Sequence, residues 1–166
     1  MEDDYSILFL CPHNAAKSVI AAAYFERLAA ERGVILRATS AGTDPAPGVA
    51  PGVAAALPAE GVDVRGHRPR SVTREGLATA YRVVSLGCDL GDIAPPGLVV
   101  EHWDDVPSPS ADLTRACAVI AARVRQLVDT EASRGVNSRA NSHALAPSLI
   151  LQVLEGKERH HEMDHA

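Results

Sequence analysis

The sequence predicts a three-layer, doubly wound α/β fold in which a parallel sheet of four strands is flanked by helices. Strand-like and helix-like segments alternate along the 166 residues, an order that is typical of parallel sheets covered on both faces. A loop that carries a cysteine also leads directly from the first strand-like segment to the first helix-like segment. We expect residues 5–133 to form this domain. Residues 134–166 are expected to form a C-terminal extension that is partly helical and has a frayed tail.

Four short segments rich in apolar and β-branched residues are expected to be strands. The first contains the run Ile7-Leu8-Phe9-Leu10, and the third is ended by Gly87. Residues 62–64 could add a brief extended piece between the second and third strands. The four predicted strands cover residues 6–10, 34–41, 82–86 and 98–102.

The first predicted helix begins within the cysteine-bearing loop. Strong helix formers without glycine or proline fill residues 17–32, and Gly33 stops the helix. A loop with three prolines, residues 42–52, leads to a short helix that ends near Gly61.

Two N-cap residues mark the helices that follow. Thr73 precedes a helix of one to two turns that runs to Ala80, and Asp112 precedes the clearest helix of the chain. After a polar break, residues 145–154 suggest a last helix. The apolar residues of the Asp112 helix share one face at helical spacing: Leu113, Cys117, Ile120, Ala121, Val124, Leu127 and Val128.

The composition argues against several classes of protein. The net charge of −5 disfavours a nucleic-acid-binding surface. No apolar run approaches the roughly 18–20 residues that cross a bilayer, and the acidic start is unlike a signal peptide. Three cysteines do not make a disulfide framework, and nothing fixes the histidine-rich tail as a metal site. We therefore expect a cytoplasmic monomer or homodimer without nucleic-acid, membrane or metal partners.

Residues 11–18, here called the Cys11 loop, have the composition of an oxyanion-binding site. Ligands of such sheets bind beyond the carboxyl ends of the strands, and a loop of small residues before a helix can aim several backbone N–H groups at one point. Such a loop favours the thiolate of a cysteine at its first position. The alternative is a structural turn with a buried cysteine. The candidates are Cys11 as the nucleophile and, for binding the substrate, Pro12, His13, Asn14, Ala15, Ala16 and Ser18.

Two polar residues of the Cys11 loop have expected partners. The Ser18 hydroxyl can donate a hydrogen bond to the sulfur of Cys11. The side chain of Asn14 can hold the loop by bonding across to a neighbouring turn.

The Cys11 loop resembles the signature of the low-molecular-weight protein tyrosine phosphatases and their thioredoxin-coupled arsenate reductase relatives, with Cys11, Asn14 and Ser18 in register. That signature is a cysteine, five residues, an arginine and a serine directly after the first strand, and the similarity continues at residues 40–43, 83–86 and 101–103. The resemblance implies the phosphotyrosine phosphatase I fold. It also implies either hydrolysis of a phosphomonoester or phosphotyrosine through a covalent Cys11 intermediate, or reduction of arsenate. A reductase would need an external thiol, such as thioredoxin or a low-molecular-weight thiol, and no other cofactor is implied.

Two positions depart from the family pattern. Lys17 stands where the family has arginine, which replaces a planar two-oxygen grip by a point charge. Ser108 stands where the resemblance places the aspartate that protonates the leaving group, so Asp104 or Asp105 would have to reach in. Lys17, Asp105 and Asp104 therefore join Cys11 as catalytic candidates.

Cys88 is a candidate redox residue. In the arsenate reductase branch a resolving cysteine follows the third strand, and Cys88 lies close to that place. A second such cysteine is absent from residues 92–95. Cys117 is expected to be a buried residue of the long helix.

Two interpretations stay open at this point. The first is a cysteine-dependent phosphatase or arsenate reductase, and the second is a non-catalytic module of the same fold that binds phosphate or arsenate. Cys11 and Ser18 favour the enzyme, because a mere binding loop needs neither a nucleophile nor its hydroxyl donor. Lys17 and Ser108 together favour the binding module.

Overall fold

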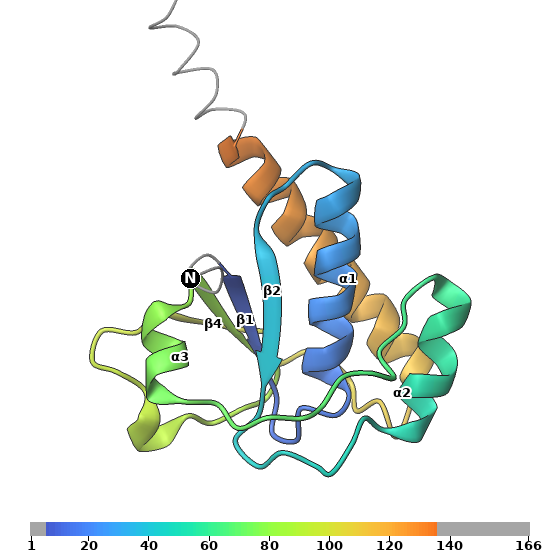
Figure 1. The fold of residues 1–166 in the computed structure, drawn as a ribbon, viewed down its shortest axis with the longest axis horizontal. Helices are drawn as coiled ribbons and strands as arrows, with labels where there is room; N and C mark the ends of the chain where they lie inside the picture. Colours follow the sequence, from blue (N-terminus) through green and yellow to red (C-terminus); the bar gives the residue numbers. More distant parts are fainter. Residues whose placement is uncertain (1–5, 136–166) are drawn as a thin grey trace, which may run out of the picture. The chain divides into compact units, whose positions relative to one another are not determined.

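The computed structural model describes residues 6–135 (Figure 1). Residues 113–135 are helical. The other elements are β1 (Ser6–Leu10), α1 (Lys17–Glu31), β2 (Arg37–Ala41), α2 (Pro51–Ala56), the 3-10 helix η2 (Leu57–Glu60), α3 (Arg74–Thr79), β3 (Arg82–Ser85), the 3-10 turn η3 (Gly91–Ile93) and β4 (Val100–His102).

The four strands form one parallel sheet in the order β2-β1-β3-β4. In its register, Leu10 pairs with Ala41 of β2 and with Ser85 of β3. All carboxyl ends therefore lie at one edge, where ligands of such sheets bind. The predicted fold class is confirmed.

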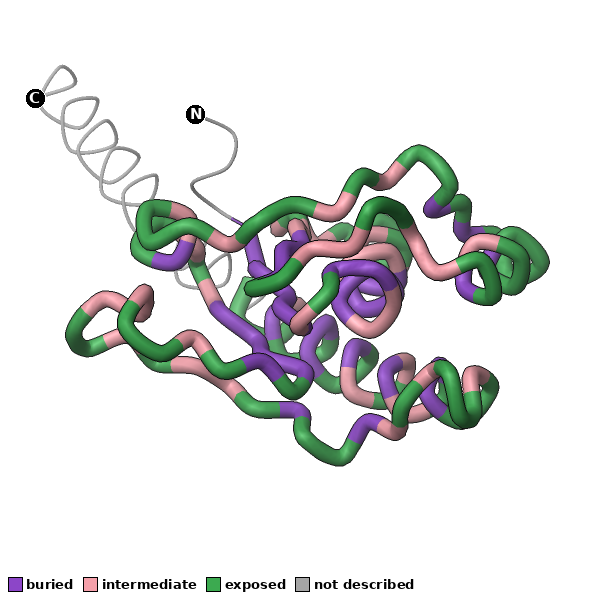
Figure 2. Tube along the Cα trace, turned by 90° about the horizontal axis from the view of Figure 1, so that it is seen from below, coloured by how far each residue is buried: buried purple, intermediate pink, exposed green. Residues whose placement is uncertain are grey.

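The two faces of the sheet bury separate apolar clusters, because successive side chains of a strand point to opposite faces. Ile7 and Phe9 face the larger cluster with α1 and the helix from residue 113, whereas Leu8 and Leu10 face a smaller cluster with Leu77 of α3. Figure 1 shows α1 and α3 on opposite sides of the sheet. Figure 2 shows buried residues concentrated in the strands and on the inner sides of the helices. The sheet is thus the middle of three layers.

The second strand is shorter than predicted and begins at Arg37 rather than at residue 34. The reason is the end of α1. Gly33 adopts a left-handed φ of 67°, its N–H donates to the carbonyl of Ala30, and the N–H of Val34 donates to the carbonyl of Ala29. This arrangement is a Schellman motif, so Val34 belongs to the helix terminus and Ile35 is 89% exposed.

Other predicted boundaries shift by one or two residues. β3 ends at Ser85 and β4 begins at Val100, and residues 62–64 pair with no strand. Both predicted caps are present: the Thr73 hydroxyl accepts from the N–H of Gly76 at 3.0 Å, and the Asp112 carboxylate accepts from the N–H of residue 115 at 3.0 Å.

The compact unit that carries the sheet ends at Asp129. The predicted boundary after residue 133 stays a prediction, and the helix expected at residues 145–154 lies outside the described residues. Within residues 6–135, no helix combines the length and apolarity needed to span a bilayer. The same residues contain no cluster of three or more side chains suited to a metal ion.

Candidate active site

The Cys11 loop lies at the carboxyl edge of the sheet, between β1 and α1. β1 is a central strand, and its last residues are fixed on both sides, since Cys11 N–H donates to Ala41 O and Leu86 N–H donates to Leu10 O. The N-cap of α1 is Ala16, whose side chain cannot cap the helix. The first N–H groups of α1 therefore have no side-chain partner from the cap and remain available to an anion.

Cys11 stands at the start of a short chain of buried hydrogen bonds. Its sulfur lies 2.9 Å from the hydroxyl oxygen of Ser18. That oxygen accepts from the side-chain amide of Asn14, also at 2.9 Å. Because the amide occupies a lone pair of the hydroxyl, the hydroxyl proton is free to point at the sulfur.

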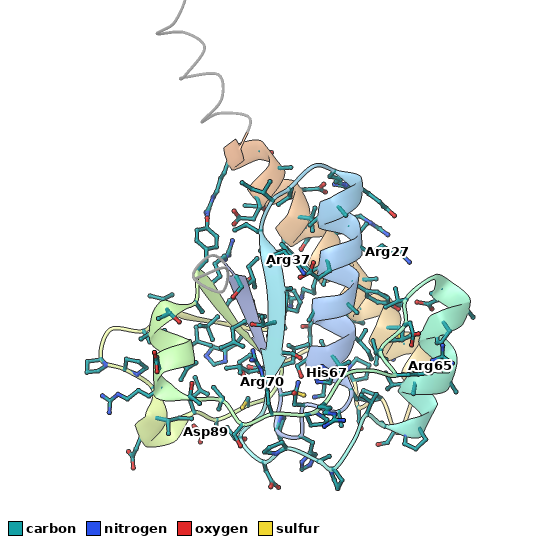
Figure 3. All side chains as sticks on the ribbon, in the orientation of Figure 1. Arg27, Arg37, Arg65, His67, Arg70 and Asp89 are labelled. Atoms are coloured by element: carbon teal, nitrogen blue, oxygen red, sulfur yellow. The ribbon has the colours of Figure 1, made fainter. Side chains whose placement is uncertain are left out.

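Asn14 also ties the loop to the segment between η2 and α3. Its backbone has a left-handed φ of 48°, and its side-chain oxygen accepts from the N–H of Arg70 and from Nε2 of His67, each at 3.1 Å. Figure 3 shows His67 and Arg70 on the segment that crosses this edge of the sheet. Burial and the nearby Arg70 charge lower the pKa of His67. The sequence indicated a neighbouring turn as the partner but did not single out His67.

The loop after β2 packs closely against the backbone of the Cys11 loop. A Cβ atom on Gly42 would lie 2.6 Å from Pro12 O, 2.8 Å from Cys11 O and 2.9 Å from Asn14 N, so only glycine fits there without movement. The carbonyls of Pro12, His13 and Ala15 accept hydrogen bonds at 2.8–2.9 Å from the N–H groups of Asp44, Ala46 and Ala50. These carbonyls are thereby turned toward that loop and away from the centre of the Cys11 loop, which leaves its centre to N–H groups.

A cavity of about 510 Å³ opens at the Cys11 loop. Its walls come from the loop itself, from the start of α2 and from the residues before the helix at 113. Asn14 and Ser18 lie buried behind it. The lining is largely small or apolar: Cys11, Pro12, His13, Ala15, Ala16, Lys17, Ala50, Gly52, Val53, Ser108, Pro109, Ser110 and Leu113.

Lys17 is half-buried and lines this cavity. Its ammonium nitrogen lies 3.4 Å from the position that a Cβ on Gly87 would take, so the side chain reaches toward the end of β3. Within residues 6–135 the structure gives Lys17 no acidic partner. Lys17 thus contributes to the lining of the cavity, and its ammonium lies near Gly87 at the carboxyl edge of the sheet.

Asp104 and Asp105 are exposed, and neither lines the cavity. The carboxylate of Asp105 instead accepts from Arg123 at 2.7 Å. The structure does not bring either aspartate together with Cys11. The wall opposite the loop contains Ser108 and Ser110, whose hydroxyl oxygens are 2.8 Å apart.

The three cysteines are free and buried, and they occupy different places. Cys11 packs in the cluster on the α1 face of the sheet, whereas Cys88 packs with Leu8 and Leu10 on the α3 face. The Cys88 sulfur lies 3.6 Å from the hydroxyl of Thr43. The redox role of Cys88 stays a prediction.

Tyr24, Arg27 and Glu60 form a polar group that holds η2, and thereby the end of α2, to α1. Cys117 adjoins this group through the hydroxyl of Tyr24. The hydroxyl of Tyr24 donates to the carboxylate of Glu60, and Arg27 donates to the Glu60 carbonyl. Burial, reinforced by the Glu60 hydrogen bond, raises the pKa of Tyr24, and burial raises the pKa of the Cys117 thiol. Because α2 contributes Val53 to the cavity wall, this group positions part of that wall.

Comparison with known proteins agrees with this geometry. The model of the low molecular weight phosphotyrosine protein phosphatase family matches residues 6–95. No curated protein matches the chain significantly. A thioredoxin-dependent arsenate reductase of Corynebacterium glutamicum is 28% identical, with a TM-score of 0.63, over 76% of this chain and 61% of that one. This chain thus spans less than two thirds of that reductase.

In two further comparisons, the match covers nearly the whole length of the solved chain. The arsenate reductase of Archaeoglobus fulgidus is 30% identical over 74% of this chain and 98% of that one, with a TM-score of 0.62. The low molecular weight protein tyrosine phosphatase of T. tengcongensis is 20% identical over 75% of this chain and 98% of that one, with a TM-score of 0.61. At this identity the likeness shows the fold alone. The chain described here belongs to the low molecular weight phosphotyrosine protein phosphatase family.

Proposed function

We propose that the protein is a cysteine-dependent phosphatase that hydrolyses phosphate monoesters with an apolar organic group. The observation that carries this proposal is the hydrogen-bonded chain of Cys11, Ser18 and Asn14 beneath the cavity. A binding module has no need of a nucleophile held by a hydroxyl donor, so the non-catalytic interpretation is not favoured.

The reaction follows from the position of each group. The N–H groups of the Cys11 loop and the ammonium of Lys17 hold the phosphate oxygens, which stabilises the charge of the transition state. The Cys11 sulfur attacks phosphorus, so that an S–P bond forms and the ester P–O bond breaks. Water then attacks the thiophosphate, which releases phosphate and restores the thiolate.

The cavity supports an organic substrate rather than a bare oxyanion. A phosphate group fills only the space above the loop, whereas the cavity measures about 510 Å³, within the usual size of small-molecule sites. Val53, Pro109 and Leu113 line it, and these side chains can contact an aryl or alkyl group.

A second candidate is a thiol-dependent arsenate reductase. It is supported by the C. glutamicum and A. fulgidus relatives, at 28% and 30% identity, which are both arsenate reductases. In this reaction the Cys11 thiolate displaces hydroxide from arsenate, and a thiol then attacks the Cys11 sulfur. Arsenite leaves with two electrons while a disulfide forms. An external thiol, such as thioredoxin or a low-molecular-weight thiol, can make this attack, and Cys88, which packs in the cluster on the α3 face, is the candidate within the chain.

One set of assays separates the two candidates. Purified protein is given p-nitrophenyl phosphate and, separately, arsenate with thioredoxin or with dithiothreitol. We expect turnover of the aryl phosphate that Cys11→Ser abolishes, while Cys88→Ser retains it. Arsenate reduction without phosphatase turnover would replace the first candidate by the second. Equal activity of the wild type and Cys11→Ser with both substrates would contradict both.

A further inference from the structure

The proposed reaction needs a proton for the leaving oxygen, and the cavity offers few groups that can supply it. Of the described residues that line it, the titratable side chains are Cys11, His13 and Lys17, and none is a carboxylate. Cys11 is the nucleophile, and a lysine ammonium that holds phosphate is needed with its charge. Histidine is the side chain that most readily exchanges a proton between pH 5 and 8.

The His13 ring is held in one orientation. Its Nδ1 atom lies 2.9 Å from the backbone carbonyl of Asp44. A carbonyl can only accept, so Nδ1 carries a hydrogen in both protonation states, and Nε2 is the nitrogen that gains and loses the proton. Asp44 is itself fixed, because its N–H donates to the carbonyl of Pro12. No described residue bonds to Nε2.

The charged and titratable groups that face His13 come from two loops. The carboxylate of Asp44 lies 3.8 Å from Nδ1 and faces the ring from the loop after β2. Lys17 and Cys11 line the same cavity from the Cys11 loop, and the facing wall at residues 108–110 contributes no titratable side chain. The His13 side chain is 65% exposed, so water can restore its proton.

On the basis of the proposed phosphatase function, we propose that His13 is the general acid and base of the reaction, in the place of the absent aspartate. As the Cys11 sulfur attacks phosphorus, the bond to the leaving oxygen breaks and that oxygen takes the proton of Nε2. In the second step Nε2 takes a proton from the attacking water as the S–P bond breaks. The sum of the two steps is one ester and one water giving one alcohol and one phosphate, with no oxidant or reductant.

His13→Asn is the informative variant. The asparagine amide can still donate to the Asp44 carbonyl, as Nδ1 of histidine does, but it has no proton to transfer near neutral pH. The control is His102→Asn, since His102 is an exposed histidine on β4 outside the cavity. Turnover is measured from pH 5 to 9 with phenyl phosphate, a poor leaving group, and with p-nitrophenyl phosphate, a good one.

We expect His13→Asn to lower kcat for phenyl phosphate by about 100-fold or more, in the range that general acids contribute. The loss should be much smaller for p-nitrophenyl phosphate, and the fall of kcat at high pH should disappear. The inhibition constant of inorganic phosphate should change little, which separates proton transfer from binding.

Other outcomes overturn the inference in distinguishable ways. A wild type without Cys11-dependent turnover of either ester would defeat the proposed function and the role of His13 with it. If the wild type is active and His13→Asn loses both esters equally or keeps its alkaline limb, the function stands and His13 is not the acid. Loss of that limb in Asp105→Asn instead would assign the proton to Asp105.

Discussion

Replacing Gly42 by alanine tests whether backbone packing shapes the Cys11 loop. In the structure the added Cβ atom would meet Pro12 O at 2.6 Å, Cys11 O at 2.8 Å and Asn14 N at 2.9 Å. All three are backbone atoms of the loop, so no flexible side chain can give way. The loop after β2 or the Cys11 loop itself must move by several tenths of an ångström.

Two magnitudes follow from this clash. Inserting a methyl group into a filled space typically costs about 1–3 kcal/mol of folding free energy. The displaced atoms also belong to the residues that place the sulfur and the N–H groups, and a misplacement of about 1 Å can cost on the order of 100-fold in rate. We therefore expect Gly42→Ala to lose turnover by one to two orders of magnitude while the protein still folds.

The matched control is Gly48→Ala. Gly48 lies in the same loop, its Cβ would meet nothing within 4 Å, and its φ lies outside the left-handed region. Urea unfolding and kcat/KM for an aryl phosphate are measured for both variants. Equal stability and equal kcat/KM of Gly42→Ala and Gly48→Ala would refute the idea that Gly42 shapes the site.

Three further substitutions test the packing of α2, the titration of His67 and the role of Lys17. Tyr24→Phe removes the hydrogen bond to Glu60 and should cost about 1 kcal/mol and raise KM severalfold by loosening α2; an unchanged urea midpoint would contradict this. The lowered pKa of His67 means that the unfolded chain takes up a proton first as pH falls below 6.5. The unfolding free energy should therefore drop from pH 7.5 to 5.5, and His67→Gln should flatten this dependence; an equal drop in both proteins would exclude His67 as its source. Lys17→Arg should raise aryl phosphate turnover by about tenfold or more through a two-oxygen grip, whereas unchanged rates would place Lys17 away from the phosphate.

The fold and the contact between Cys11 and Ser18 could be predicted from the sequence. The strand at residues 6–10, the Thr73 and Asp112 caps and the pairing of Cys11 with Ser18 depend on local spacing, and local spacing can be read directly. The sequence wrongly places residue 34 in a strand, because its apolar side chain fits a strand as well as a helix terminus. Only the hydrogen bonds of Val34 and Gly33 decide between them.

The site residues that the sequence missed are joined to the loop across long stretches of chain. His67 contacts Asn14 from 53 residues away, and the carbonyl of Asp44 contacts His13 from 31 residues away. No local pattern encodes such pairs. Asp105 shows the converse case, since its position in the sequence lies near that of the family's acid, whereas the structure pairs its carboxylate with Arg123.

In the proposed reaction Cys11 forms a covalent bond to phosphorus, and this intermediate can be trapped. Turnover of p-nitrophenyl phosphate is stopped within milliseconds by acid, and the peptide containing Cys11 is analysed by mass spectrometry. We expect a phosphoryl group on the Cys11 sulfur in the wild type and none at that site in the control without substrate. An active enzyme whose peptide carries phosphate on Ser18 or His13, or carries none at all, would contradict it.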